Sequence, residues 1–140
     1  MSRPSRSSRH GAFSVFRIPF EGEAGALPAK ELVGSKAHNL MRMARCGLPV
    51  PAGFVLGTDL WRTFSRHGRD ALHGFGAVLA GELEHLAGAT GRRFGDARRP
   101  LLVSVRSGAA VSMPGMMETI LNVGLTRETL RGVVRSTGNP

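Results

Sequence analysis

The chain has 140 residues, 41% of them hydrophobic and 6% aromatic, which suffices for one modest core and indicates a single domain. No apolar run approaches the ~20 residues needed to cross a bilayer, and the one cysteine, Cys46, has no internal disulfide partner, so we expect a cytoplasmic protein with no membrane association. The net charge of +9, to which arginine contributes far more than lysine, favours anionic partners such as nucleotides, phosphates, nucleic acids or acidic protein surfaces, or reflects only the base composition of the genome.

Residues 1–12 are rich in arginine and serine and hold no acidic residue. Such a segment buries too little apolar surface to offset the loss of chain entropy, so we expect a disordered basic tail, with an organelle transit peptide as the alternative. The domain is expected to begin at residue 13. Residues 13–20 have the pattern of a strand that Pro19 ends, and residues 21–29 have the composition of a loop.

A helix is predicted over residues 36–45, with Ser35 as its N-cap and Gly47 at its left-handed C-terminal position. Two prolines then lead into a short buried strand, residues 53–56. Thr58 is expected to cap a second helix, residues 59–67.

The apolar positions of the second helix, all expected to face inward, are Leu60, Trp61 and Phe64. A longer helix is predicted over residues 70–89, although its three glycines each cost roughly 1 kcal/mol relative to alanine.

The apolar run 101–105 has the pattern of a central strand, and a loop over residues 107–117 follows it. A further strand is expected at residues 120–123 and a last helix at residues 127–136. This mixture of strands and helices indicates an α/β or α+β fold.

Lys36 lies in the predicted first turn of a helix, directly after Gly34 and Ser35. A cation is unfavourable at this end of the helix dipole unless the helix N-terminus and the lysine both face a phosphate group. The alternative is a simple exposed lysine. The spacing is not that of a Walker A loop.

Arg106 stands at the end of the apolar run, where its guanidinium is able to hold phosphate oxygens through two parallel hydrogen bonds. The small residues Ser107, Gly108 and Ala109 allow close approach of the backbone to a ligand. The alternative is a glycine-rich turn with a salt-bridged arginine. The five histidines are scattered, and no carboxylate pair has the spacing of a magnesium or zinc site, so we expect no metal ligands in this chain.

Together these segments resemble one known family. The run from Pro100 to Leu125, with Ser-Val-Arg-Ser-Gly-Ala (104–109) and Ser-Met-Pro-Gly-Met-Met (112–117), is similar to the N-terminal region of pyruvate, phosphate dikinase. Gly-Ser-Lys-Ala-His-Asn-Leu (34–40), Gly-Leu-Pro-Val-Pro-Ala-Gly-Phe (47–54) and Thr-Gly-Arg-Arg-Phe-Gly-Asp (90–96) match the same family. The related phosphoenolpyruvate synthases carry looser versions of these motifs.

The resemblance implies the N-terminal subdomain, over residues 13–140, of an incomplete ATP-grasp-like nucleotide-binding domain. That domain transfers a phosphoryl group from ATP to a histidine of a separate domain, on the way to phosphoenolpyruvate, AMP and pyrophosphate. Lys36 and Arg106 match the lysine and arginine that hold the phosphates, Arg106 also in a catalytic role. The loop matching the family's phosphate-covering loop contributes Ser107, Gly108, Ala109, Ser112, Met113 and Gly115.

The family's lysine motif is usually Gly-Gly-Lys-Gly-Ala-Asn, so Ser35, Ala37 and His38 are departures, and the first two reduce backbone freedom beside the lysine. The family's Mg²⁺ ligands, phosphohistidine and barrel domain lie beyond Pro140 in its pattern. We therefore expect a fragment that binds ATP with Mg²⁺ ligands from outside this chain and that is incomplete for catalysis alone. The alternatives are a non-catalytic module that docks on the remaining dikinase domains or on a full-length dikinase, and, least favoured, a basic nucleic-acid binder.

Overall fold

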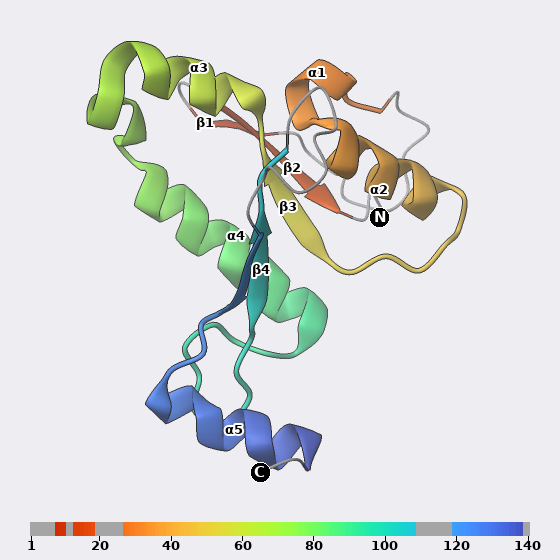
Figure 1. The fold of residues 1–140 in the computed structure, drawn as a ribbon, viewed down its shortest axis with the longest axis vertical. Coiled ribbons are helices and arrows are strands. Elements are labelled where there is room, and N and C mark those ends of the chain that lie inside the picture. Colours follow the sequence, from red (N-terminus) through yellow and green to blue (C-terminus); the bar gives the residue numbers. More distant parts are fainter. Residues whose placement is uncertain (1–7, 11–12, 19–26, 109–118, 139–140) are drawn as a thin grey trace, which may run out of the picture. The chain divides into compact units, whose positions relative to one another are not determined.

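The structure is a computed structural model that describes residues 8–10, 13–18, 27–108 and 119–138 (Figure 1). It is an α+β protein with small antiparallel sheets, and it forms two compact units. The first unit comprises residues 1–78 and 108–114, and the second comprises residues 79–107 and 115–140.

The first unit is built on a three-stranded antiparallel sheet. Its strands, in spatial order, are β1 (Ser8–His10), β2 (Phe13–Ile18) and β3 (Gly53–Leu56). In the central strand β2 every residue but Arg17 is buried, because both faces of this strand are covered.

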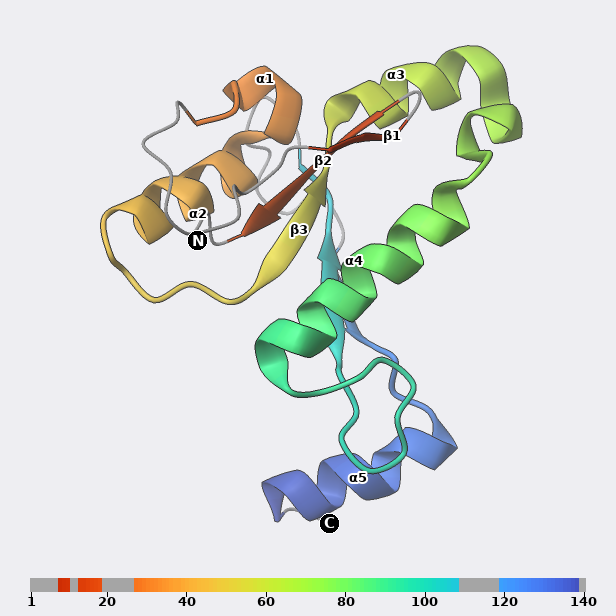
Figure 2. The ribbon, with the colours of Figure 1, turned by 180° about the vertical axis from the view of Figure 1, so that it is seen from behind.

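On one face of this sheet lie the helices α1 (Lys30–Val33) and α2 (Ser35–Arg45), which Figure 2 shows from behind. Phe16 and Ile18 of β2 form a buried cluster with Val33 and Met41, the latter completely buried. The half-buried Leu40 packs against this cluster from the same helix as Met41. The apolar side of α2 therefore fixes this helix on the sheet, and with it the helix turn that carries Lys36.

Helix α3 (Thr58–His67) is joined to β2 by polar contacts. The Ser14 hydroxyl donates to the Asp59 carboxylate (2.7 Å), and the Gly57 N–H donates to the Ser14 carbonyl (2.8 Å). A Cβ on Gly57 would meet the Asp59 carboxylate, so a larger residue where the chain passes from β3 to α3 would require that side chain to shift.

The second unit contains most of α4 (Phe75–Thr90), the two-stranded ribbon of β4 (Val103–Arg106) and β5 (Thr119–Val123), and α5 (Arg127–Thr137). Thr126 and Thr129 form a reciprocal capping box at the start of α5. Helix α5 packs on the segment 97–100 through Gly132, since a Cβ there would lie 2.5 Å from the Ala97 carbonyl oxygen.

Several sequence predictions are confirmed by these elements: strands within the predicted ranges 13–20, 53–56 and 120–123, and the helices α2, α3 and α5. The strand 53–56 was predicted to be buried, but all four of its residues are only half-buried. The left-handed conformation of Gly47 after α2 (φ +77°) is also confirmed. The predicted strand end at residues 19–20 lies outside the described residues, as does most of the predicted loop 107–117. Helix α1 was not predicted.

Both predicted N-caps are wrong by one residue. Gly34 is the N-cap of α2 and Gly57 that of α3, so Ser35 and Thr58 are the first helical residues. The Thr58 hydroxyl instead donates to the Glu31 carbonyl at 2.7 Å. A tail was expected over residues 1–12, yet Ser8–His10 pair with β2, because backbone hydrogen bonds to a sheet edge do not require apolar side chains.

The predicted inward position of Trp61 is wrong, because its side chain is 69% exposed and stacks on Phe64 with ring centroids 6.2 Å apart. The predicted long helix 70–89 is broken: a 3-10 helix, η1 (Gly68–Leu72), precedes Gly74 at φ +76°, and α4 begins at Phe75. Glycine tolerates this left-handed turn, which the apolar periodicity did not reveal.

The apolar run 101–105 is not a central strand in the described part of the chain, where β4 pairs only with β5. Leu101 is buried, whereas Val105 is 52% exposed. Apolar character therefore predicted a strand but not its place in a sheet. No helix within the described ranges is long and apolar enough to cross a membrane.

Gly132→Ala should lower the free energy of unfolding by about 1–3 kcal/mol, because its methyl group must displace the backbone at Ala97. Gly88→Ala in α4 is the matched control: open space surrounds Gly88, and alanine should stabilise the helix by up to about 1 kcal/mol. Urea unfolding followed by circular dichroism measures both. Equal effects of the two substitutions would contradict the tight contact at Gly132.

Candidate functional site

Lys36 is the second residue of α2, and its side chain is exposed. The first hydrogen bond of the helix runs from the His38 N–H to the Gly34 carbonyl (3.0 Å), and no side chain caps the helix through Gly34. The backbone N–H groups of Ser35, Lys36 and Ala37 precede that bond and carry the positive end of the helix dipole. The lysine charge and the helix dipole therefore act in the same place.

The corner between α1 and α2 depends on Gly34. Its backbone has φ +80° and ψ 160°, a conformation accessible essentially to glycine only. The Gly34 N–H donates to the Lys30 carbonyl at 2.7 Å, which closes α1, while the Gly34 carbonyl opens α2. This residue therefore determines the direction in which α2 starts.

Two side chains attach this corner to its surroundings. His38 Nδ1 lies 3.1 Å from the Pro28 carbonyl oxygen, and in the tautomer with a proton on Nδ1 it donates to that oxygen. On the other side, Thr58 holds the Glu31 carbonyl. The helix N-terminus that carries Lys36 is thus fixed by hydrogen bonds as well as by the apolar face of α2.

Gly108, from the arginine motif, lies against this same corner within the first unit. A Cβ on Gly108 would be 3.8 Å from both the Gly34 Cα and the Val33 carbonyl oxygen. Segments more than 70 positions apart in the sequence therefore meet backbone to backbone at the start of α2.

The other predicted phosphate ligands are distributed as follows. Arg106 is the last residue of β4, paired with Thr119 of β5, and it is exposed, as is Ser107; both belong to the second unit. The remaining predicted loop residues lie outside the described residues: Ala109, Ser112, Met113 and Gly115. Among the described residues, no group of three or more His, Cys, Asp or Glu side chains has the arrangement of a metal site.

The departures from the glycine-rich lysine motif have a simple structural basis. Ser35 and Ala37 lie in the first turn of α2, and neither has a positive φ, so neither position requires glycine. The one glycine that is kept, Gly34, is the one whose backbone requires it.

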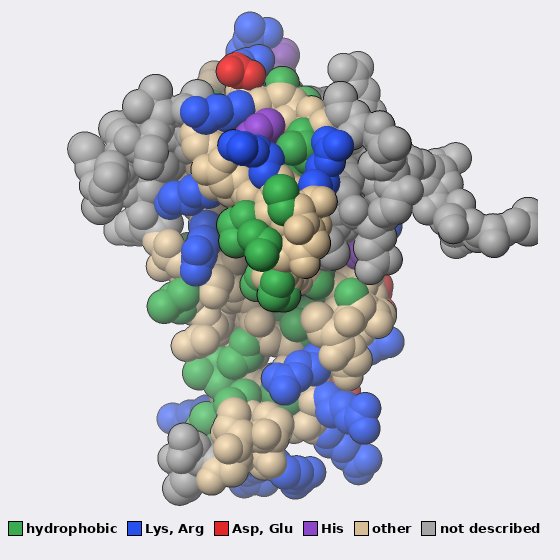
Figure 3. Space-filling model, turned by 90° about the vertical axis from the view of Figure 1, so that its right-hand side faces the viewer, with side chains coloured by type: hydrophobic (Ala, Val, Ile, Leu, Met, Phe, Trp, Pro, Cys, Tyr) green, Lys and Arg blue, Asp and Glu red, His purple; other side chains and the backbone are tan. Residues whose placement is uncertain are grey.

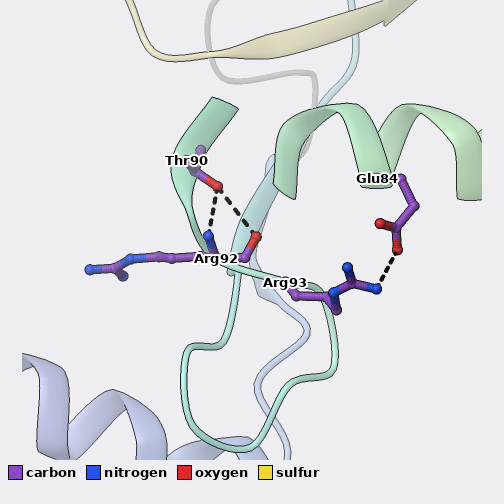
Figure 4. Close-up of polar contacts among 4 residues, drawn as sticks. All are labelled: Glu84, Thr90, Arg92 and Arg93. Atoms are coloured by element: carbon purple, nitrogen blue, oxygen red, sulfur yellow. Dashed lines mark hydrogen bonds and ion pairs between the residues drawn. The ribbon is translucent and has the colours of Figure 1, made fainter. Parts of the chain in front are cut away.

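The segment from Thr90 to Leu101 forms a closed loop in the second unit. The Thr90 hydroxyl contacts both the backbone N–H and the carbonyl of Arg92 (3.3 and 3.4 Å; Figure 4). The Arg93 N–H donates to the Arg99 carbonyl (3.0 Å), and the Leu101 N–H donates to the Arg93 carbonyl (2.9 Å).

Asp96 stabilises the turn of this loop, because its Oδ1 accepts hydrogen bonds from the backbone N–H groups of Arg98 (2.6 Å) and Arg99 (2.7 Å). The Arg99 N–H, the Arg98 N–H and the nearby positive charges of Arg93 and Arg98 lower the pKa of Asp96 below its ordinary value of 3.8. The sequence predicted this segment only as a match to a family motif, with no role.

No protein-family model matches the chain. Curated proteins do: "Pyruvate, phosphate dikinase 2" of Zea mays is 46% identical over 125 residues, which are 89% of this chain and 14% of the maize protein. The Clostridium symbiosum "Pyruvate, phosphate dikinase" is 39% identical over 86% of this chain and 14% of its own length. The chain is homologous to one segment of pyruvate, phosphate dikinase.

A third dikinase, from Entamoeba histolytica, is 43% identical over 79% of the chain and 12% of its own length. Relatives from a plant, a bacterium and a protist thus match most of this chain, which confirms the resemblance predicted from the motifs. The chain spans about one seventh of the length of the first of these dikinases.

Sequence reasoning missed three residues that shape the site: Gly34, His38 and Thr58. A glycine immediately before a helix that lacks a Ser, Thr, Asp or Asn cap is a usable signal for Gly34. No local signal exists for the contacts of His38 and Thr58, which reach backbone carbonyls 10 and 27 positions away.

Gly34→Ala should destabilise the chain by about 1–3 kcal/mol, because alanine is strained at φ +80° and ψ 160°. Gly53→Ala in β3 is the control: no atom lies near its Cβ position, and its φ is not positive, so the change should stay within about 0.5 kcal/mol. Urea unfolding curves measure both. A Gly34 variant as stable as the wild type would contradict the strained corner.

Asp96→Asn should remove one part of the acid dependence of stability. Because the folded-state pKa lies below the unfolded value, the carboxylate stabilises the fold above the unfolded pKa, and this contribution is lost as the pH falls through the folded pKa. Unfolding free energies measured by urea titration from about pH 6 down to about pH 2 test this. We expect a shallower decline below about pH 4 in the variant; an unchanged slope would contradict the assignment.

Proposed function

We propose that this chain forms part of the ATP-binding site of a dikinase-type phosphotransferase with an ATP-grasp-like nucleotide domain. Lys36 and Arg106 neutralise the phosphates of ATP, and Ser107, Gly108, Ala109, Ser112, Met113 and Gly115 belong to the loop that covers them. The observation that carries the proposal is the contact of Gly108 with Gly34 at the N-terminus of α2. Homology to one segment of pyruvate, phosphate dikinase supplies the reaction class.

The start of α2 has the electrostatic properties that a polyphosphate requires. A helix N-terminus presents backbone N–H groups and a partial positive charge, and Lys36 adds a full charge within the same turn. An anion at this position would also relieve the unfavourable placement of a lysine at the positive end of the helix. Glycine at position 108 leaves the backbone free to approach the ligand closely.

The proposed contribution of this segment is binding and orientation of ATP, not the whole transfer. Phosphoryl transfer depends on positioning and on neutralisation of charge, with Mg²⁺ as a main contributor. In this proposal the Mg²⁺ ligands and the phosphate-accepting histidine come from dikinase residues outside this segment. The segment alone would then bind ATP weakly and would not catalyse.

A second candidate function, docking on the other domains of a dikinase, is favoured by one observation. The β4–β5 ribbon and the turn after it expose large apolar side chains, each between 43% and 61% accessible: Val105, Ile120, Leu121 and Leu125. A two-stranded ribbon is marginally stable in water unless another element or protein covers its apolar side chains. The two functions are compatible, since a docking surface would bring the missing catalytic groups to the bound nucleotide.

Isothermal titration calorimetry of the chain with ATP and Mg²⁺ tests the ATP proposal. We expect saturable binding that Lys36→Ala and Arg106→Ala each weaken roughly 10- to 100-fold, the usual range for loss of one charged hydrogen bond. Arg42→Ala, in the last turn of α2, and Arg127→Ala are matched controls, because each removes a positive charge away from the start of α2 and from β4. An absence of binding heat, or an equal loss in the controls, would rule out the proposed site.

A further inference from the structure

The second unit holds a pocket that the proposed ATP site does not use. Its volume is about 340 Å³, and it lies between the C-terminal end of α4, the segment before β4 and the last turn of α5. The residues that line it are Thr90, Gly91, Arg92, Arg99, Pro100 and Ser136. Two guanidinium-bearing residues and no acidic residue thus contribute to its wall.

Figure 3 shows Lys and Arg side chains on both the upper and the lower part of the face in view. The arginines of this unit outside β4 come from two places, the loop after α4 and helix α5: Arg92, Arg93, Arg98, Arg99, Arg127, Arg131 and Arg135. Not all of them are available to a ligand. Arg93 is paired with Glu84 at 3.1 Å.

Arg92 and Arg99 differ from Arg93 in this respect. Within the described part of the chain neither guanidinium forms an ion pair, and Figure 4 shows the Arg92 side chain extending away from the Arg93–Glu84 pair.

The backbones of both arginines are held by side chains of the same loop. The Thr90 hydroxyl contacts the N–H and the carbonyl of Arg92, and the Asp96 carboxylate accepts the N–H of Arg99. The backbone hydrogen bond from the Arg93 N–H to the Arg99 carbonyl then joins the two sides of the loop. Two arginines whose backbones form hydrogen bonds within the loop therefore line one pocket.

Two helix C-termini adjoin the pocket, and their negative dipole ends alone would repel an anion. Some carbonyls near these two helix ends accept hydrogen bonds from within the chain. Thr90 and Gly91 donate to the Leu86 and Ala87 carbonyls, and the hydroxyls of Ser136 and Thr137 donate to the Val133 carbonyl. Against the two dipole ends, the wall of the pocket carries two arginines and no acidic residue.

We propose that this pocket is a second oxyanion site, which binds a phosphate-bearing small molecule through Arg92 and Arg99. Planar guanidinium groups bind phosphate oxygens through paired, charge-assisted hydrogen bonds, so two of them are sufficient for selective binding of a small phosphate. The site is independent of the ATP proposal, because it uses neither Lys36 nor Arg106.

Inorganic phosphate is the probe, titrated into the Lys36→Ala chain so that the start of α2 does not contribute. Two-dimensional amide NMR should show saturable shifts at Gly91, Arg92 and Arg99. Arg92→Gln and Arg99→Gln should each weaken binding roughly 10-fold or more, and the double variant should abolish it. Arg98→Gln is the matched control, since Arg98 belongs to the same turn but does not line the pocket.

Thermal melts of each variant check that the fold is intact, which we expect because both side chains are exposed. Three results would overturn the proposal: no saturable shift, an equal loss in Arg98→Gln, or shifts that chloride at the same ionic strength reproduces. The second and third would mean that the arginines only complement the helix dipoles or attract anions diffusely. Loss of ATP binding with phosphate binding retained here would reject the ATP proposal alone.

Discussion

The backbone conformation of Gly34 is the constraint on which the first unit depends. At φ +80° and ψ 160° it closes α1 with its N–H and opens α2 with its carbonyl, so that it sets the direction of a helix whose apolar side contributes Met41 to the core. A side chain there would be strained, and a different backbone would rotate α2 away from β2. The same residue forms the surface that Gly108 approaches, so the packing of the core and the geometry of the candidate phosphate site have one origin.

Local patterns predicted the elements well, because helical and strand periodicity report which face of an element is buried. Helix α2 and strand β3 have the expected bounds to within a residue. The failures concern properties that a local pattern does not contain. Gly34, and not Ser35, is the N-cap of α2, because the chain turns sharply there in a conformation that glycine allows. Trp61 stacks on Phe64 at the surface, because nothing in the described residues covers that face of α3.

The candidate site likewise has features that the sequence predicted and features that it did not. The position of Lys36 in the first turn of a helix follows from a helix start and a glycine, both visible in the sequence. The meeting of Gly108 with Gly34 joins segments far apart along the chain, and only motif resemblance suggested that they cooperate. The hydrogen bonds from His38 and Thr58 could not be predicted, because each acceptor is a backbone carbonyl, and every residue carries one.

The net charge of +9 illustrates why composition alone does not identify a ligand. Arg93 is neutralised by Glu84, whereas Arg92, its neighbour in sequence, lines a pocket whose wall contains no acid. Their surroundings differ: Arg93 lies beside Glu84, whereas the backbones of Arg92 and Arg99 form hydrogen bonds with Thr90 and Asp96. A positive charge on a mobile side chain only raises the local concentration of anions. On a fixed backbone it selects the geometry of the anion, and for that reason the specificity of a basic protein depends on the residues that hold its arginines.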